Sequence, residues 1–298
     1  MDPLRWLARP IQRATTPSDG TAGTWRAWAA SSLRVAGELV LLGMALWAAA
    51  HVINLTAYGW RVPNGDVAEY RRYAVDFWTR QPLFHHLPVE YPPLAIIPFT
   101  LILLSPWPDP VVAFSWWMAV LVMAGYVWLR HYASRGKAIT YATYLLLGAT
   151  SIVLLRFDLF PALVTLLALW SAQHRRFIWA YGLLAAGILL KLYPVFLVPL
   201  VAIEQWQTLR GQSVLTFVAR RSDQPRALGR ALVAWARQPA ARRVAVGLCV
   251  CAGIVVAVFA LADLVAHDTA FSGFTYAGTR PLQIESTPAS ILWLGTFL

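Results

Sequence analysis

The stretch VAGELVLLGMALWAAAHVINL, residues 35–55, decides the fold class. It is almost unbroken in apolar side chains, and a helix of this length crosses the ~30 Å hydrocarbon core of a bilayer at about 1.5 Å per residue. Further apolar runs predict further helices at residues 111–129, 138–155, 159–173, 177–190, 193–206 and 244–266. The sequence therefore predicts an all-α, polytopic membrane protein.

The composition agrees with this fold class. Of the 298 residues, 58% are hydrophobic and only 13% are charged, and the mean hydropathy is +0.55. A soluble globular protein has roughly 25% charged residues, so this chain has too little charge to cover a soluble core of its size. These values exclude a soluble enzyme, a disordered protein and a disulfide-stapled secreted domain.

The net charge of +11 indicates membrane topology rather than a nucleic-acid partner, because cytoplasmic loops collect Lys and Arg. We expect residues 1–34 and the basic loop 207–243 to be cytoplasmic in a multi-pass protein of the plasma membrane, where their arginines meet anionic lipid headgroups. This assignment holds if the proline-rich segment 94–108 enters the bilayer only as a shallow or re-entrant segment, which is the topology we adopt; a second crossing hidden elsewhere in the chain would satisfy it equally well. The transmembrane domain then covers 35–298, and we expect it to be incomplete at its C-terminus, since the last apolar run, 289–298, is too short to cross.

This topology places the loop 56–93 on the outer face. Apolar residues recur there at helical spacing from residue 67 to residue 77, which predicts a helix lying in the membrane interface. Asp66 follows the turn signal Asn64-Gly65, and its carboxylate could act as a general base at the mouth of a membrane-embedded cavity. The alternative is that Asp66 only caps the helix, while Glu69 and Arg72 form a surface pair.

Other charged residues interrupt apolar runs on the same face. Arg156 and Asp158 form a charged pair at a membrane boundary, which indicates either a functional site or a self-paired turn between two helices. Lys191 ends an apolar run on the outer side, where an ammonium group could hold the phosphate of a lipid-linked ligand or snorkel to the interface. His85-His86 is weak evidence for a metal, because no spaced partner accompanies it.

Several short motifs, in their order and spacing, resemble the GT-C class of integral-membrane glycosyltransferases, and within it family 87, the polyprenyl-phosphate-mannose-dependent mannosyltransferases of cell-envelope glycolipids. The resemblance covers about residues 35–290. The motifs that carry it are Gly65-Asp66 with Tyr70, Tyr91-Pro92-Pro93-Leu94, Arg156-Phe157-Asp158, Gly182 to Gly187 leading into Lys191-Leu192-Tyr193-Pro194, and Arg280 to Ser286.

The resemblance implies a GT-C-like helical bundle with its active site at the outer face. It places the catalytic base on Asp66 and the donor-phosphate contacts on Lys191, Arg156 and Arg280. Residues expected to contact the acceptor or to support the site are Glu69, Arg72, Tyr91, Asp158, Tyr193 and Glu285. The implied reaction moves a hexose, mannose in this family, from a polyprenyl-phosphate donor to a glycolipid or glycan acceptor with inversion. No cofactor is expected, although the outer acids leave a divalent cation open.

Two other functions stay open at this point. One is a catalytically silent membrane scaffold or truncated relative, whose loop 207–243 binds anionic lipid or a partner. The other is a transporter of a lipid-linked sugar, with Arg156, Asp158 and Lys191 lining its path. The scaffold hypothesis requires Asp66 to be dispensable for function. The transporter hypothesis requires flux of the lipid-linked sugar across the membrane without a glycosidic product.

Overall fold

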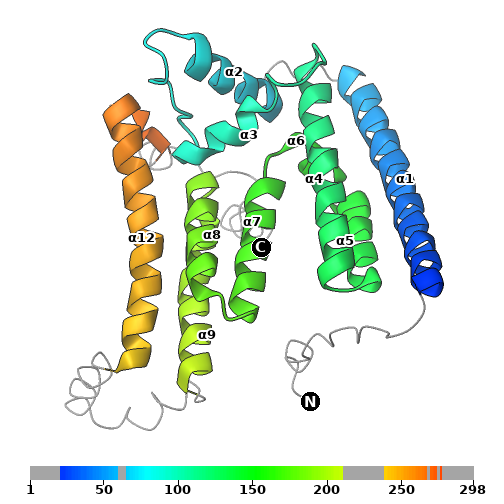
Figure 1. Ribbon diagram of the computed structural model, residues 1–298. Coiled ribbons are helices and arrows are strands. Elements are labelled where there is room, and N and C mark those ends of the chain that lie inside the picture. Colours follow the sequence, from blue (N-terminus) through cyan, green and yellow to red (C-terminus); the bar gives the residue numbers. More distant parts are fainter. Residues whose placement is uncertain (1–20, 60–64, 211–237, 267–268, 274–275, 277–298) are drawn as a thin grey trace, which may run out of the picture. The chain divides into compact units, whose positions relative to one another are not determined.

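The computed structural model describes residues 21–59, 65–210, 238–266, 269–273 and 276 (Figure 1). Throughout these residues the regular structure is helical, without a strand, which confirms the all-α prediction. The chain divides into two compact units, residues 1–67 with 107–159 and residues 68–106 with 160–298. Each unit is described by itself.

The first unit is built on long helices that lie side by side. Its elements are α1 (Thr21–Gly59), α4 (Pro110–Tyr132), α5 (Arg135–Gly148) and α6 (Thr150–Leu155), and α4 contacts the other three. The side chain of Asp109 caps α4 by accepting hydrogen bonds from the amides of Val111 (2.8 Å) and Val112 (3.3 Å). Ser134 caps α5 in the same way through the amide of Lys137 at 3.2 Å.

A carboxylate ties three helices of this unit together. Glu38 of α1 accepts a hydrogen bond from the hydroxyl of Tyr126 at 2.7 Å and pairs with Arg130 at 3.4 Å, both on α4. It also pairs with Arg135 of α5 at 2.7 Å. The Glu38 side chain is only 14% exposed, so its charge requires these partners.

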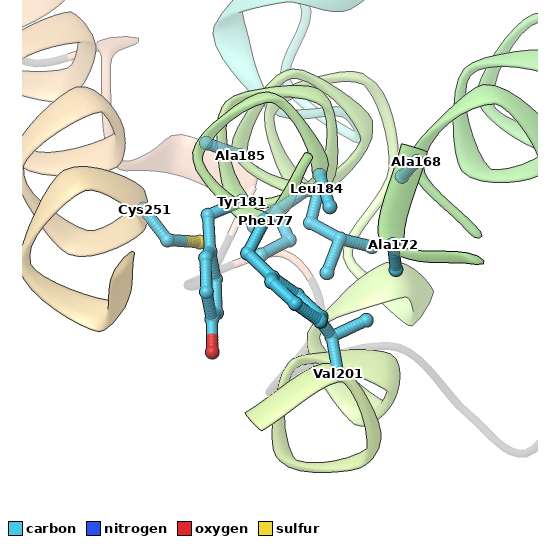
Figure 2. Close-up of a cluster of buried hydrophobic side chains, with 10 residues drawn as sticks. Ala168, Ala172, Phe177, Tyr181, Leu184, Ala185, Val201 and Cys251 are labelled. Atoms are coloured by element: carbon cyan, nitrogen blue, oxygen red, sulfur yellow. The ribbon is translucent and has the colours of Figure 1, made fainter. Parts of the chain in front are cut away.

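The second unit packs around α8 and α12. Its elements are α2 (Asp66–Thr79), η1 (Pro93–Ala95), α3 (Ile96–Thr100), α7 (Leu159–Gln173), α8 (Phe177–Leu190), η2 (Tyr193–Leu197), α9 (Val198–Arg210) and α12 (Pro239–Ala266). The first residues of α2 and α7 belong to the first unit. Figure 2 shows the core side chains meeting from α7, α8, α9 and α12. Tyr181 lies within this core and donates a hydrogen bond to Gln205 of α9 at 3.1 Å.

Three helices are long and apolar enough to cross a membrane, among the residues that the structure describes. They are Ala29–Val52 within α1, Pro110–Tyr132 and Pro239–Ala266. The helices Leu159–Gln173 and Phe177–Leu190 are apolar but shorter. The prediction of a membrane protein is supported at this level, whereas the number of crossings and the orientation stay predictions.

The structure differs from the predicted segments at three places. The run 138–155 forms two helices, α5 and α6, because the chain breaks at Gly148-Ala149, where the Thr150 hydroxyl donates to the carbonyls of Leu145 and Leu146. Helix α1 begins at Thr21, within the segment 1–34 that was expected to precede the first helix. The run 193–206 begins as the 3-10 helix η2 before it continues as α9.

The segment 94–108 forms no long helix, and its entry into the bilayer as a shallow or re-entrant segment stays a prediction. Its helical part ends at Thr100, and residues 101–104 continue as turns. Pro92 and Pro93 fix the entry to this segment and Pro98 lies inside α3, which limits how far a helix can extend. Loop 207–243 and residues 289–298 lie largely or wholly outside the described residues.

Candidate functional site

The first unit brings two of the predicted site residues together. The guanidinium Nε of Arg156 lies 2.9 Å from a carboxylate oxygen of Asp66, and both side chains are almost half exposed. The two residues are far apart in the sequence but adjacent in this unit. Asp66, the residue predicted to be the catalytic base, is therefore paired with a residue predicted to hold phosphate.

Local structure fixes the backbone on both sides of Arg156. Arg156 ends α6 in an extended conformation, with φ −124° and ψ 145°. Its neighbours Leu154 and Phe157 are buried, and the hydroxyl of Ser115 donates to the carbonyl of Leu154 at 3.3 Å. The apolar neighbours thus fix the segment, and the arginine between them remains half exposed.

Asp66 is the first residue of α2 rather than the residue before it. An acidic residue in the first turn stabilises a helix through the helix dipole. The structure nevertheless uses its carboxylate for the pair with Arg156, so a capping role alone does not describe it. Asp158, the other acid predicted here, directly precedes α7 and is partly buried.

Helix α2 packs its apolar face on protein side chains of the second unit. The ring of Tyr70 stacks on Phe99 of α3 with centroids 4.3 Å apart and meets Tyr91 edge to face at 5.9 Å. Tyr73 is buried on the same face. The predicted apolar face is confirmed, while the position of α2 in a membrane interface stays a prediction.

Two carboxylates, one on this helix and one in the loop after it, act on the phenol of Tyr73. Glu69 pairs with Arg72 one turn later, as the surface-pair hypothesis expected. Burial raises the pKa of Tyr73 well above its usual range, and the carboxylates of Glu90 and Glu69 raise it further. Tyr73 therefore stays protonated at neutral pH and can donate a hydrogen bond, but it cannot serve as a base.

Lys191 lies at the end of α8, in the second unit. It is partly buried and extended, with φ −157° and ψ 136°, and its amide donates to the carbonyl of Gly187 at 2.8 Å. The next residues turn back and pack closely on α8. A Cβ at Gly187 would lie only 3.2 Å from the ring of buried Pro194. The glycine therefore permits the tight packing that places Lys191 and the exposed Tyr193 at this end of the helix.

Part of the loop 56–93 contacts the segment that follows α12 in the second unit. The hydroxyl of Thr269 donates to the carbonyl of His85 at 2.7 Å, and a Cβ at Gly273 would lie 3.5 Å from the carbonyl of Val89. The Pro93–Ala95 turn next to Tyr91 contacts both α8 and α12. Arg280 and Glu285, which follow this segment in the sequence, lie outside the described residues.

No group of three or more His, Cys, Asp or Glu side chains that could hold a metal ion occurs in the described part of the chain. His85 and His86 belong to the loop that packs against Thr269. Metal dependence stays open on these observations.

The sequence analysis missed two features of the first unit. Glu38 lies inside the run 35–55, and a carboxylate within an apolar run is itself a signal that could have identified it. A cavity of about 370 Å³ lies between α1 and α4, and no sequence signal indicated it.

Comparisons of the chain with protein families, with curated proteins and with solved structures found no match.

Proposed function

We propose that the chain is a membrane glycosyltransferase that transfers a hexose, in the first instance mannose, from a polyprenyl-phosphate donor to a hydroxyl of a glycolipid or glycan acceptor. The observation that carries the proposal is the pairing of Asp66 with Arg156. A carboxylate that is held by a guanidinium and almost half exposed suits proton transfer from a bound hydroxyl.

The reaction assigns one task to each group. The acceptor hydroxyl transfers its proton to the carboxylate of Asp66, and its oxygen forms a bond to the anomeric carbon. The bond from that carbon to the phosphate oxygen breaks, and its electron pair leaves with the polyprenyl phosphate. Attack from the side opposite the leaving group inverts the configuration.

Arg156 positions Asp66 in this proposal, because it already pairs with the carboxylate. Cations stabilise the developing negative charge on the leaving phosphate, and Lys191 and Arg280 are the proposed groups. Glu69, Arg72, Tyr91, Asp158, Tyr193 and Glu285 are the proposed contacts to the acceptor or supports of the site. The enzyme would act at the outer face of the plasma membrane.

The test is transfer of labelled mannose from polyprenyl-phosphate mannose to a lipid extract, in membranes that contain the chain. We expect Asp66→Asn to lower transfer by at least a hundredfold at equal protein level, because the amide cannot accept the proton. Asp76→Asn is the matched control, since Asp76 lies on the same helix and has no proposed role. Near wild-type transfer by Asp66→Asn would refute Asp66 as the base, and no transfer by the wild type would refute the proposed reaction.

A further inference from the structure

The cavity of the first unit is lined by one stripe from each of two membrane-length helices. Its volume of about 370 Å³ lies in the lower part of the range of small-molecule sites. We call it the tryptophan pocket; its lining residues are Gly43, Leu46, Trp47, Ala50 and His51 of α1, Val112, Ser115, Trp116, Ala119 and Met123 of α4, and Trp107 and Leu154.

Small residues keep the tryptophan pocket open between large aromatic rings. Trp107 and Trp116 lie together with ring centroids 5.1 Å apart, and Trp47 stacks on His51 at 5.5 Å. Gly43, Ala50 and Ala119 leave the space between them. Because the walls are mainly apolar and the Ser115 hydroxyl already donates to a carbonyl, the pocket suits a hydrocarbon rather than a sugar or water.

One wall of the pocket leads directly to the candidate site. Leu154 lines the pocket, and two residues later Arg156 pairs with Asp66. Even a fully extended chain would cover at most about 7 Å over that step, so a ligand with its chain in the pocket can carry its head to the pair. The pair is net neutral, and a neutral hydroxyl head therefore fits it better than a phosphate, which would meet the carboxylate as well as the guanidinium.

From this geometry we propose that the tryptophan pocket binds the hydrocarbon chain of the acceptor, so that the acceptor is a neutral glycolipid with its chain between α1 and α4 and its reacting hydroxyl at Asp66. This inference rests on the proposed function, and it adds the chemical class of the acceptor and the place of its chain.

The first test is direct binding. The probe is decyl α-mannoside with a photoreactive diazirine at the end of its chain, added to the purified full-length chain in nanodiscs. We expect mass spectrometry to find the label on peptides that contain residues 43–51 or 112–123, with unlabelled decyl α-mannoside competing and methyl α-mannoside not. Labelling elsewhere, or labelling that decyl α-mannoside does not displace, would overturn the proposal.

Filling the pocket supplies the matched comparison. Ala119→Trp places a large ring in the pocket, whereas Ala124→Trp adds the same ring at an exposed position of the same helix. We expect Ala119→Trp to lower labelling at least tenfold and Ala124→Trp to leave it unchanged. Trp47→Ala removes a wall instead of adding bulk, and should lower labelling as well, so the proposal stays testable if Ala119→Trp does not fold.

The second test separates the acceptor role from simple lipid binding. With the two mannosides as acceptors, Ala119→Trp should raise the KM for decyl α-mannoside at least tenfold relative to the KM for methyl α-mannoside. An equal change for both would overturn the pocket as the site of the acceptor chain. Wild-type transfer to the lipid extract but to neither mannoside would overturn the inference and leave the proposed function standing, while absence of all transfer with labelling retained would refute the proposed function.

Discussion

At the scale of single residues, the pair of Asp66 and Arg156 contributes more to the orientation of the Asp66 carboxylate than to the stability of the fold. Both side chains are almost half exposed, and solvent-exposed ion pairs contribute about 0–1 kcal/mol to stability. A folded chain does not depend on the pair. The orientation of the Asp66 carboxylate does depend on the pair, because the Arg156 guanidinium is the group that fixes it.

This predicts that Arg156→Ala lowers transfer at least tenfold while changing the free energy of unfolding by less than about 1 kcal/mol. Arg156→Lys should recover part of the activity, since it keeps the charge but loses the planar geometry of the guanidinium. The measurements are transfer from polyprenyl-phosphate mannose and thermal unfolding of the purified variants. Arg80→Ala, at an exposed position after α2, is the control, and wild-type transfer by Arg156→Ala would contradict the positioning role.

The sequence could identify such residues one at a time but not as a pair. Arg156 and Lys191 stood out because a charge that interrupts an apolar run is costly wherever the run packs. The contact between Arg156 and Asp66 depends on how α6 ends and on where α2 begins, which no local pattern contains. Glu38 was missed for a different reason, because one carboxylate hardly changes the mean hydropathy of a long apolar run.

At the scale of helices, close approach of α8 and α12 depends on one glycine. A Cβ at Gly247 of α12 would lie 2.1 Å from Cε2 of the Tyr181 ring. Tyr181 cannot easily move, because its ring is buried and its hydroxyl is bonded to Gln205. Gln205 in turn donates to the carbonyl of Arg243 on α12 at 3.3 Å, so the contact joins α8, α9 and α12.

We therefore expect Gly247→Ala to destabilise the protein by about 1–3 kcal/mol through overpacking. Gly253→Ala, six positions further along the same helix, has nothing within 4 Å of the added Cβ and should be neutral or stabilising by up to about 1 kcal/mol, because alanine favours helix. Thermal unfolding in detergent compares the two. In a Tyr181→Leu background the cost of Gly247→Ala should largely disappear; an equal cost in both backgrounds would contradict the contact.

Helix prediction succeeded where strong local signals bound a run and failed where tertiary contacts decide. The runs 159–173 and 177–190 match α7 and α8 because charged residues, Asp158 and Lys191 among them, stand at their ends. The run 138–155 gave no sign of its break, which depends on the Thr150 hydroxyl and on the packing of α6 against α4. The tryptophan pocket was not predictable for the same reason, since two helices far apart in sequence form it.

At the scale of the molecule, the exposed side chains of the long helices indicate whether these helices lie in water or in a membrane. Large apolar side chains are widely exposed on them, among them Trp47 (71%) and Leu41 (68%) of α1 and Leu264 (74%) and Val256 (66%) of α12. A soluble protein rarely leaves this much apolar surface on its helices in water. In a bilayer the same side chains face lipid, so exposure here supports membrane insertion rather than an unfinished fold.

The orientation of the molecule can be tested on a single helix. If Pro110–Tyr132 crosses the membrane, its two ends lie on opposite sides, and the positive-inside rule places the end with Arg130 and Arg135 in the cytoplasm. In a Cys249→Ala, Cys251→Ala background we introduce Pro108→Cys at the exposed turn before α4 or Gly136→Cys, where an added Cβ meets nothing within 4 Å.

We expect a membrane-impermeant maleimide to label the Pro108→Cys variant in intact cells and the Gly136→Cys variant only after permeabilisation. Because both cysteines flank the same helix, the result does not depend on how other segments cross. Labelling of both variants in intact cells would contradict a crossing by α4, and the reverse pattern would place the basic end outside. The reverse pattern would also put the Asp109 end of α4 in the cytoplasm. It would then contradict the proposed donor and acceptor chemistry, which depends on this end lying at the outer face.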